Sequence, residues 1–323
     1  MAEISEIKKR LNQMFGNNTE MVGLYIERFG SHLSISNINK IREEYKDQIE
    51  REASAADALF ETDLTCPICG TEKVIHQELK AKSQIISFDP FMTPIYKPIE
   101  GFKSVNYSLY SVTVCHKCYY ASPDRKDFKN FSLTSRVWEE AKLTAISKSD
   151  LVDTMAERMS IVEEEGDAGF GLFDMPRNVE SGILSYKMAI ERAHVETRNK
   201  EKAAWTKKGY YWGKIALLIR QGGESPKPYL EEMAKCFEQS FFYSDYPSAV
   251  IEFQTLYVLS ALKLYLGNRK DCRKYMSELD KIKAEYKNGI RTDRSQGKLD
   301  SWIDKGQRLW ESREEEDLWD LPK

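Results

Sequence analysis

Two Cys-x-x-Cys pairs constrain this chain more than any other feature of its sequence. Cys66 and Cys69 lie in TCPICG, Cys115 and Cys118 lie in VCHKCYYA, and 45 residues separate the two pairs. Three-residue spacing lets one tight turn present both sulfurs on the same side, and two such turns complete a tetrahedral shell of four thiolates. We therefore predict that these four cysteines hold one structural zinc ion in a β ribbon.

The alternatives differ in what they require around the cysteines. A rubredoxin-like iron site has the same spacing, so iron stays open as the metal. His76 and His116 lie near the pairs and are alternative ligands. A thioredoxin-like redox site needs a pair that opens a helix after a strand, which neither string offers. Because a full S4 shell has no open position, we expect the metal to stabilise the fold rather than to activate water.

The rest of the sequence indicates a cytoplasmic protein. Its apolar stretches are shorter than the roughly 18 residues that cross a membrane, and its start lacks the apolar core of a secretory signal. In a reducing compartment, paired cysteines indicate a metal rather than disulfides. The net charge is −3, and residues 61–129 carry nine Lys or Arg against eight Asp or Glu. No basic field is therefore present in the sequence to attract nucleic acid or a membrane surface.

Patterning divides the chain into four predicted parts. Residues 1–58 form an N-terminal helical segment, 59–130 the zinc-ribbon module, 131–175 a helical connector and hinge, and 176–323 a helical domain. The predicted fold is mainly α, with a small β zinc-ribbon module and C-terminal tetratricopeptide-like helical repeats. Within the first part, the prediction is an apolar stripe of Ile4, Ile7, Leu11 and Met14, a helix capped by Asn18 or Thr19 that runs to Phe29, and a charged helix capped by Ser36 or Asn37.

Two segments of the ribbon module have distinct patterns. The run from Leu109 to Val114 is typical of a strand. The segment from Phe88 to Phe102 carries three prolines, which disfavour both a long helix and a central strand. We predict that this second segment is a long exposed loop that tolerates shortening.

A degenerate repeat runs through the predicted helical domain. Large and small residues recur in triplets, three of which have steps of four and three, as in paired helices where a small residue admits its neighbour. The periods are 39 and 44 residues, so a helical bundle without repeats is the alternative. The recurring positions are Gly182, Tyr186, Ala189; Met233, Phe237, Ser240; Cys272, Met276, Leu279; Trp212, Ile215, Ala216; and Leu256, Leu259, Ser260. A final helix with Leu299, Trp302, Ile303, Gly306, Leu309 and Trp310 on one face would cap the stack.

The repeat interpretation predicts a partner-binding groove. If the recurring positions pack between helices, then Tyr211, Lys214, Gln254 and Tyr257 turn to another face and become candidate groove residues. The alternative is that the two tyrosines fill the core.

These features resemble a family of uncharacterised bacterial proteins, known only as a domain of unknown function, that combine an N-terminal zinc ribbon with tetratricopeptide-like helices. The likeness covers roughly residues 60–285 and rests on CPICG at 66–70, YSVTV at 110–114 running into Cys115, Cys118 with the following Tyr120-Ala121, and SYKMA at 185–189. The second knuckle reads Cys-His-Lys-Cys-Tyr-Tyr, where the family usually has Cys-Pro-x-Cys-Gly-Tyr. The resemblance implies the fold and the metal, and no reaction.

The predicted function is that of a non-enzymatic adaptor. Its helical repeats would bind a protein or peptide partner, and the zinc ribbon would be a rigid second contact surface. A nucleic-acid-binding accessory protein that uses the ribbon is the main alternative, although the charge balance does not favour it. An iron-based electron carrier is the third possibility.

Overall fold

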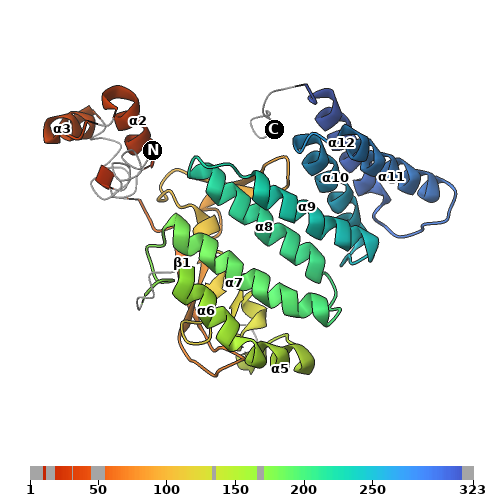
Figure 1. Cartoon of the computed structure of the whole chain (residues 1–323), viewed down its shortest axis with the longest axis horizontal. Helices are drawn as coiled ribbons and strands as arrows, with labels where there is room; N and C mark the ends of the chain where they lie inside the picture. The colour runs from red at the N-terminus through yellow and green to blue at the C-terminus, as the bar shows by residue number, and fades with distance from the viewer. Residues whose placement is uncertain are drawn as a thin grey trace. The chain divides into compact units, whose positions relative to one another are not determined.

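The computed structural model describes residues 10–11, 19–30, 32–44, 55–132, 136–165 and 171–314. These residues contain ten α-helices and four two-stranded sheets (Figure 1). The chain divides into two compact units, one made of residues 1–58 and 98–104 and the other of residues 59–97 and 105–323. Of the predicted N-terminal stripe, Ile4, Ile7 and Met14 lie outside the described residues.

The first unit is built around a pair of short helices, α2 (Thr19–Phe29) and α3 (Ile35–Glu44). Its core contains Leu11, Val22, Tyr25, Ile38 and Ile41. The predicted helix ending at Phe29 is confirmed. The predicted caps Ser36 and Asn37 are wrong, because α3 begins at Ile35 and its first turn is closed by the hydrogen bond from the Ile38 amide to the Ser34 carbonyl.

Two hairpins carry the cysteine pairs. The strands β1 (Leu59–Leu64) and β2 (Val74–Leu79) are antiparallel, and the first pair lies in the turn between them. The strands β5 (Thr113–Val114) and β6 (Ala121–Ser122) enclose the second pair in the same way. The predicted strand over 109–114 is therefore mostly wrong. Only Thr113 and Val114 are strand, and Leu109 is the last residue of the 3-10 helix η1 (Tyr107–Leu109), which Asn106 caps by accepting a hydrogen bond from the Ser108 amide.

The proline-rich segment is not the exposed loop that its sequence predicts. The strands β3 (Gln84–Phe88) and β4 (Pro94–Pro98) form a hairpin. Its turn is closed by the Asp89 carboxylate, which accepts hydrogen bonds from the amides of Phe91 and Thr93. The Phe91 side chain is completely buried in the helical core. The prolines are accommodated because they lie at the ends of a short two-stranded hairpin.

The β part of the chain also extends further than predicted. After the 3-10 helix η2 (Arg125–Asp127), the strands β7 (Asn130–Ser132) and β8 (Val137–Glu139) pair antiparallel. Residues 137–139 are thus strand, where the pattern predicted helix. Helices follow as α5 (Ala145–Asp153) and α6 (Met155–Glu165). Of the glycines in the predicted hinge, Gly171 has a φ of 98°, and Gly166 and Gly169 lie outside the described residues.

Six further helices follow among the described residues of the second unit. Polar caps begin three of them: Asn178 forms a capping box with Ser181, and Ser248 and Asn268 each accept a hydrogen bond from the first turn. The helices are α7 (Val179–Arg198), α8 (Ala204–Gln221), α9 (Lys227–Phe242), α10 (Ala249–Tyr265), α11 (Arg269–Lys287) and α12 (Gln296–Glu311). The pairs α7–α8, α8–α9 and α10–α11 make the most extensive contacts, and Figure 1 shows α7, α8 and α9 side by side.

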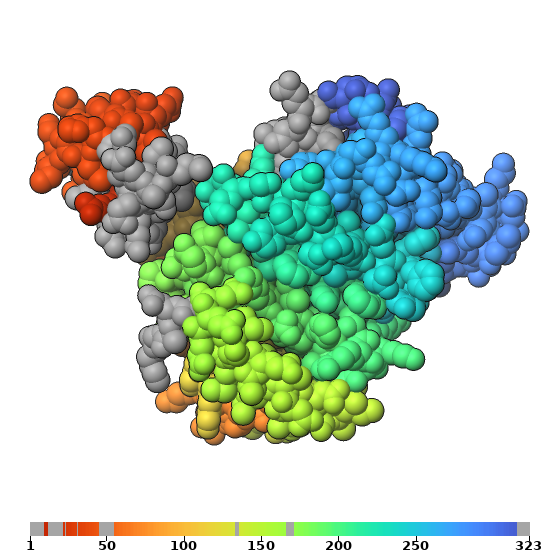
Figure 2. Space-filling view, viewed as in Figure 1, coloured from red at the N-terminus to blue at the C-terminus, as the bar shows by residue number. Residues whose placement is uncertain are grey.

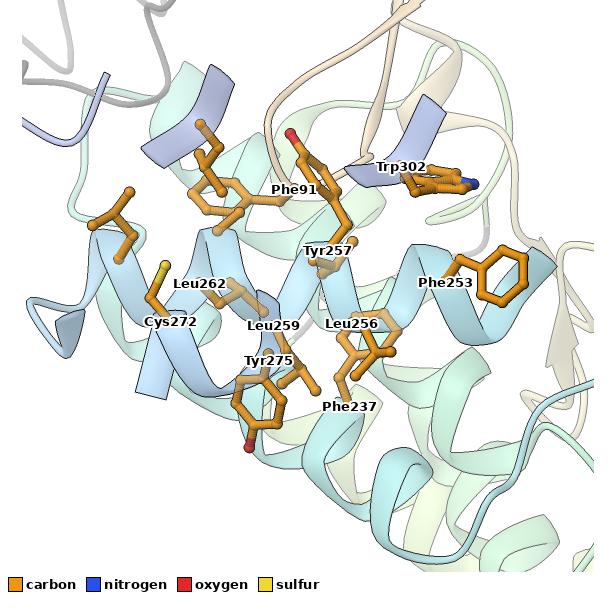
Figure 3. Close-up of a cluster of buried hydrophobic side chains, with 14 of the residues drawn as sticks. Phe91, Phe237, Phe253, Leu256, Tyr257, Leu259, Leu262, Cys272, Tyr275 and Trp302 are labelled. Carbon is orange, nitrogen blue, oxygen red and sulfur yellow. The ribbon is translucent and has the colours of Figure 1, made fainter. Parts of the chain in front are cut away.

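The recurring large and small positions form the helical core, as the sequence predicts. All fifteen are buried except Trp212 and Met276, which are half-buried and pack against the core. Figure 3 shows Phe237, Leu256, Leu259 and Cys272 meeting in one cluster from α9, α10 and α11. The predicted apolar face of the last helix is also confirmed, since Leu299, Trp302, Gly306 and Leu309 are buried on α12.

The β hairpins and the helices share their cores. Val112, Val114 and Ala121 are buried together with residues of α7 and α8 in one cluster. Gly182 on α7 permits this approach, because a Cβ atom there would lie 2.8 Å from the Leu109 side chain. The ribbon is thus packed directly onto the helices within one compact unit.

Among the helices of the described ranges, none combines the length and the apolar character needed to span a bilayer.

Candidate metal centre

The two cysteine turns have the same backbone hydrogen bonds. In the first, the Gly70 amide donates to the Cys66 carbonyl and the Cys66 amide donates to the Thr71 carbonyl, at 3.0 and 2.8 Å. In the second, the Tyr119 amide donates to the Cys115 carbonyl and the Cys115 amide donates to the Tyr120 carbonyl, both at 2.9 Å. This repeated pattern aims two sulfurs from each turn at a common point.

Both turns also need a residue with a left-handed backbone after the second cysteine. Gly70 has a φ of 73°, which glycine adopts without steric cost. Tyr119 occupies the equivalent position with a φ of 54°. Its ring packs against that of Phe173, with centroids 6.2 Å apart. The departure from glycine at the second turn therefore leaves the turn geometry intact.

The four cysteine sulfurs lie within 4.8 Å of one another. The Sγ atoms of Cys66 and Cys118 are 3.5 Å apart, and those of Cys69 and Cys115 are 3.6 Å apart. A tetrahedral ion with metal–sulfur bonds of about 2.3 Å requires sulfur–sulfur separations of about 3.8 Å. The residues therefore fit a four-coordinate metal ion. Within the described part of the chain, this is the one group of Cys, His, Asp and Glu side chains that is arranged to hold a metal.

The site is enclosed by apolar side chains. Cys66, Cys115 and Cys118 are fully buried and Cys69 is half-buried. Leu64, Val74 and Phe128 of the ribbon surround them, and Leu151 of α5 and Val195 of α7 complete the cluster. Water thus has little access to the sulfurs, and a metal bound to all four would have no open coordination position.

Crowding of the thiols changes their proton affinities. Hydrogen bonding to Cys115 raises the pKa of Cys66, and it also raises the pKa of Cys118 to about 12. Hydrogen bonds with Cys118 and with Cys66 hold the pKa of Cys115 far below its usual range. Four thiols this close cannot all ionise without a cation. A divalent ion would displace their protons, so metal affinity should fall as the pH falls.

A buried arginine supports the second cysteine turn. Arg158 of α6 is almost fully buried, and its Nε donates to the Cys118 carbonyl at 3.2 Å. Its other nitrogens donate to the Leu151 carbonyl at 2.7 Å and to the Thr154 carbonyl at 3.2 Å. A divalent ion with four thiolates carries a net charge of −2, and a guanidinium against the turn offsets part of that charge.

A second buried arginine joins the ribbon to the helices. Arg192 of α7 forms ion pairs with Asp127 at 2.5 Å and with Glu196 at 2.6 Å, and its guanidinium lies 5.6 Å from the ring centre of Tyr120. Lys207 of α8 pairs with Glu196 at 2.8 Å. The network fixes the orientation of the second hairpin relative to α7 and α8.

The nearby histidines are not part of the sulfur cluster. His76 is buried, with its Nδ1 atom 2.5 Å from the Thr113 hydroxyl and its Nε2 atom 3.1 Å from the Glu78 carboxylate. Burial lowers the pKa of His76. His116 is exposed on the second turn. Cys236 and Cys272 are buried in the helices as free thiols.

The predicted groove residues do not form a groove. Tyr211 and Tyr257 are each only 8% exposed, so their assignment to a partner surface is wrong, and they fill the core. The tyrosine rings pack on Tyr186 and Trp302 respectively. In addition, α9 lies between α8 and α10 in the order of packing, so these two helices do not form the adjacent pair that the groove required.

The two polar residues of the predicted groove have different surroundings. Lys214 donates a hydrogen bond to the Ser108 hydroxyl at 3.1 Å, and its Nζ lies 5.1 Å from the ring centre of Tyr96. Burial lowers the pKa of Lys214 to about 7. Lys214 thus connects α8 to η1 and to β4. Gln254 is half-buried on α10.

A sequence signal for the buried arginines does exist. Leu151, Met155, Arg158 and Val162 follow steps of four, three and four, so Arg158 occupies an apolar stripe. Ser185, Ala189, Arg192 and Glu196 have the same spacing. A charged residue within a buried stripe indicates an internal partner, which for both arginines lies in the second cysteine turn or just after it.

Comparison with known proteins identifies the family. Neither a curated protein nor a solved structure was found to be similar to the chain. Residues 59–298 match the family described as "Uncharacterized protein conserved in bacteria (DUF2225)". The match includes both cysteine pairs and all helices from α5 to α11. The chain therefore belongs to this family of bacterial proteins.

Proposed function

We propose that the protein is a non-enzymatic adaptor in which one structural zinc ion holds a ribbon against a helical domain that binds a protein or peptide partner. The observation that carries this proposal is the closed cluster of four cysteines, enclosed by residues of both the ribbon and the helices. A site without an open coordination position is suited to holding a fold and is unsuited to binding a substrate at the metal.

Zinc is proposed over iron on chemical grounds. Both metals accept a tetrahedral shell of four sulfurs. The pKa pattern and the enclosure of the site suit either ion, but zinc has no redox chemistry and is the usual metal of a ribbon with this spacing. The proposed zinc would supply structural cross-linking between the two hairpins, with Cys66, Cys69, Cys115 and Cys118 as its ligands.

The helical domain supports the adaptor proposal by its construction. The recurring large and small positions of the sequence pack between successive helices. Stacked helical pairs bury a continuous core and leave extended outer faces that typically bind other proteins. We infer that the stack of α7 to α12 is such a scaffold in a bacterial cytoplasm.

The metal is tested by elemental analysis of the full chain purified under reducing conditions. We expect about one zinc per chain, and loss of metal and of ribbon folding in Cys66→Ser and Cys115→Ser. Cys236→Ser and Cys272→Ser are matched controls, because these thiols lie in the helical core, away from the metal cluster. A red protein that contains iron would contradict zinc, and freshly purified protein without any metal would contradict the structural site.

The adaptor role is tested by capture with the full chain. Affinity-tagged protein, cross-linked in the source bacterium, should retain a defined partner in near-equal amount. Recovery of no partner above a tag-only control would count against the adaptor. An enzymatic role would instead need a reaction that survives in metal-loaded protein and is lost on substitution of a described polar residue.

A further inference from the structure

A cluster of positive charge lies where the start of α11 meets the end of α12. Arg269, Lys270 and Arg273 come from α11, and Trp310, Arg313 and Glu314 from α12 and the turn after it. We call these six residues the Trp310 patch. They line an open recess of about 560 Å³. Figure 2 shows residues of these two helices, in blue, at the molecular surface.

The indole at the centre of the patch is covered by arginines. Trp310 is half-buried, and the guanidinium carbons of Arg273 and Arg313 lie 4.5 and 5.0 Å from its ring centre. Cation–π contacts hold these two guanidinium groups in place. They also occupy the ring surface on which a nucleobase would stack, which disfavours single-stranded nucleic acid as the ligand.

The patch already binds one carboxylate. Glu314 pairs with Arg269 at 3.0 Å and with Arg313 at 3.5 Å. Lys270 and Arg273 are exposed and make no ion pair with any residue that the structure describes. Four cationic side chains thus face one acidic side chain, Glu314. The ion pairs of Glu314 show that the patch accepts a carboxylate. Further carboxylates are the groups that would complete the pairing.

We propose that the Trp310 patch binds an acidic peptide segment of the partner protein. This inference rests on the proposed adaptor function and names the chemistry of its partner. Carboxylates of successive acidic residues reach Lys270 and Arg273, and an apolar side chain of the segment packs against the open edge of Trp310. Because the charges are exposed, apart from the half-buried Arg313, each ion pair is weak and the binding depends strongly on salt.

The test uses the full, zinc-loaded chain and fluorescein-labelled hexaglutamate, with fluorescence anisotropy as the readout. We expect binding at low salt that weakens as sodium chloride is added. The double substitution Lys270→Glu with Arg273→Glu should weaken it about tenfold or more. Lys148→Glu with Lys227→Glu is the matched control. It makes the same change in net charge at exposed residues of α5 and α9 and should leave the affinity unchanged. The single substitution Lys270→Glu keeps the contact between Arg273 and Trp310, so weaker binding by this variant cannot come from loss of that contact.

Three results would overturn the proposal. In the first, the charge-reversed and control variants bind hexaglutamate equally well. In the second, an oligothymidylate binds more tightly than hexaglutamate and is lost in the Lys270 and Arg273 variant, which makes the patch a nucleic-acid surface. In the third, hexaglutamate binds only a chain that ends at Glu314. The acidic residues of 315–323 would then be the occupant, rather than a partner.

The patch and the adaptor proposal fail in different ways. If a partner is captured equally by wild type and by the variant with Lys270→Glu and Arg273→Glu, the patch is wrong and the adaptor stands. If wild type captures no partner, the adaptor is wrong. Zinc content should be the same in all these variants, because no substituted residue contacts the cysteine cluster.

Discussion

At the scale of single residues, the backbone of the cysteine turns decides whether four sulfurs can meet. Gly70 has a φ of 73°, and a Cβ atom at this position would have nothing within 4 Å. The cost of adding a methyl group is therefore conformational and not steric. Tyr119 shows that a side chain is tolerated at the equivalent position where packing compensates for it.

The first prediction is that Gly70→Ala lowers the free energy of unfolding by about 1–2 kcal/mol, the usual cost of a left-handed residue with a Cβ atom. Zinc content should remain at about one per chain. Gly297→Ala is the control, because Gly297 lies in α12 without a positive φ and with open space around it. That change should stabilise the protein by up to about 1 kcal/mol. Urea unfolding measures both, and equal effects of the two substitutions would refute the role of Gly70.

Lys214 leads to a prediction about pH. Burial lowers its pKa to about 7, whereas an unfolded lysine titrates near 10.4. Between these values the unfolded chain holds one more proton than the folded chain. The contribution of Lys214 to stability is therefore least favourable below about pH 7 and improves as the pH rises, by up to about 1.4 kcal/mol per pH unit.

The second prediction follows from this sign. Compared with Lys214→Met, wild type should gain stability between about pH 7.5 and 9.5. The comparison cancels the titration of tyrosines and thiols, which both proteins share. Lys148→Met, at an exposed residue of α5, should show no such difference from wild type. A wild-type advantage that stays constant over this pH range would mean that Lys214 is charged in the folded protein throughout.

At the scale of elements, the hairpin of β3 and β4 is the main addition to what the sequence predicts. Phe91 at its turn is fully buried, and its ring lies edge-on to Tyr265 with centroids 5.5 Å apart. Gly213 of α8 admits the turn, because a Cβ atom there would lie 3.2 Å from the Thr93 hydroxyl. The hairpin thus packs on the helices as part of their core.

The third prediction is that Phe91→Ala lowers the free energy of unfolding by about 3–5 kcal/mol, as for other large aromatic side chains removed from a core. Phe88→Ala at the end of β3 is the control, since that ring is about half exposed. It should cost well under 1 kcal/mol, within the usual range for a surface substitution. Deletion of the turn should unfold the helices, which is the opposite of the tolerance that the proline content predicts. Similar effects of the two alanine substitutions would contradict the packing of Phe91.

Helical periodicity was readable in the sequence because each packing position lies on one face of one helix. The apolar face of the last helix and the recurring residues of α9 to α11 are buried as their spacing predicts, apart from the half-buried Met276, Ile303 and Trp310. The position of Phe91 was not readable, since nothing local to the hairpin specifies a core formed by helices more than 100 residues later. The prediction that Tyr211 and Tyr257 face a groove was wrong for a related reason. A helix with buried residues on several faces has no free face that a single apolar stripe can reveal.

At the scale of the whole molecule, the described contacts tie the metal site to the helices within the second unit. Leu151 and Val195 of the helices lie in the same apolar cluster as the cysteines, and Arg192 pairs with Asp127 of the ribbon. The sequence pattern placed the ribbon and the helices in separate parts, because composition and periodicity change with secondary structure even where the core is continuous. Because the core is shared, loss of the metal should also destabilise the helices.

The last prediction is that removal of zinc destabilises the helices as well as the ribbon. Chelation under reducing conditions leaves four unpaired thiols in a buried site and removes the link between the two hairpins, so Leu151 and Val195 lose well-packed neighbours. Metal release and loss of helical circular dichroism should therefore coincide on heating, and chelated protein should unfold at a lower temperature in one transition. Asp127→Asn should lower the unfolding temperature of zinc-loaded protein, because it leaves buried Arg192 without one of its charged partners. Helices that keep their full thermal stability after the metal has gone would show that the ribbon folds independently of them.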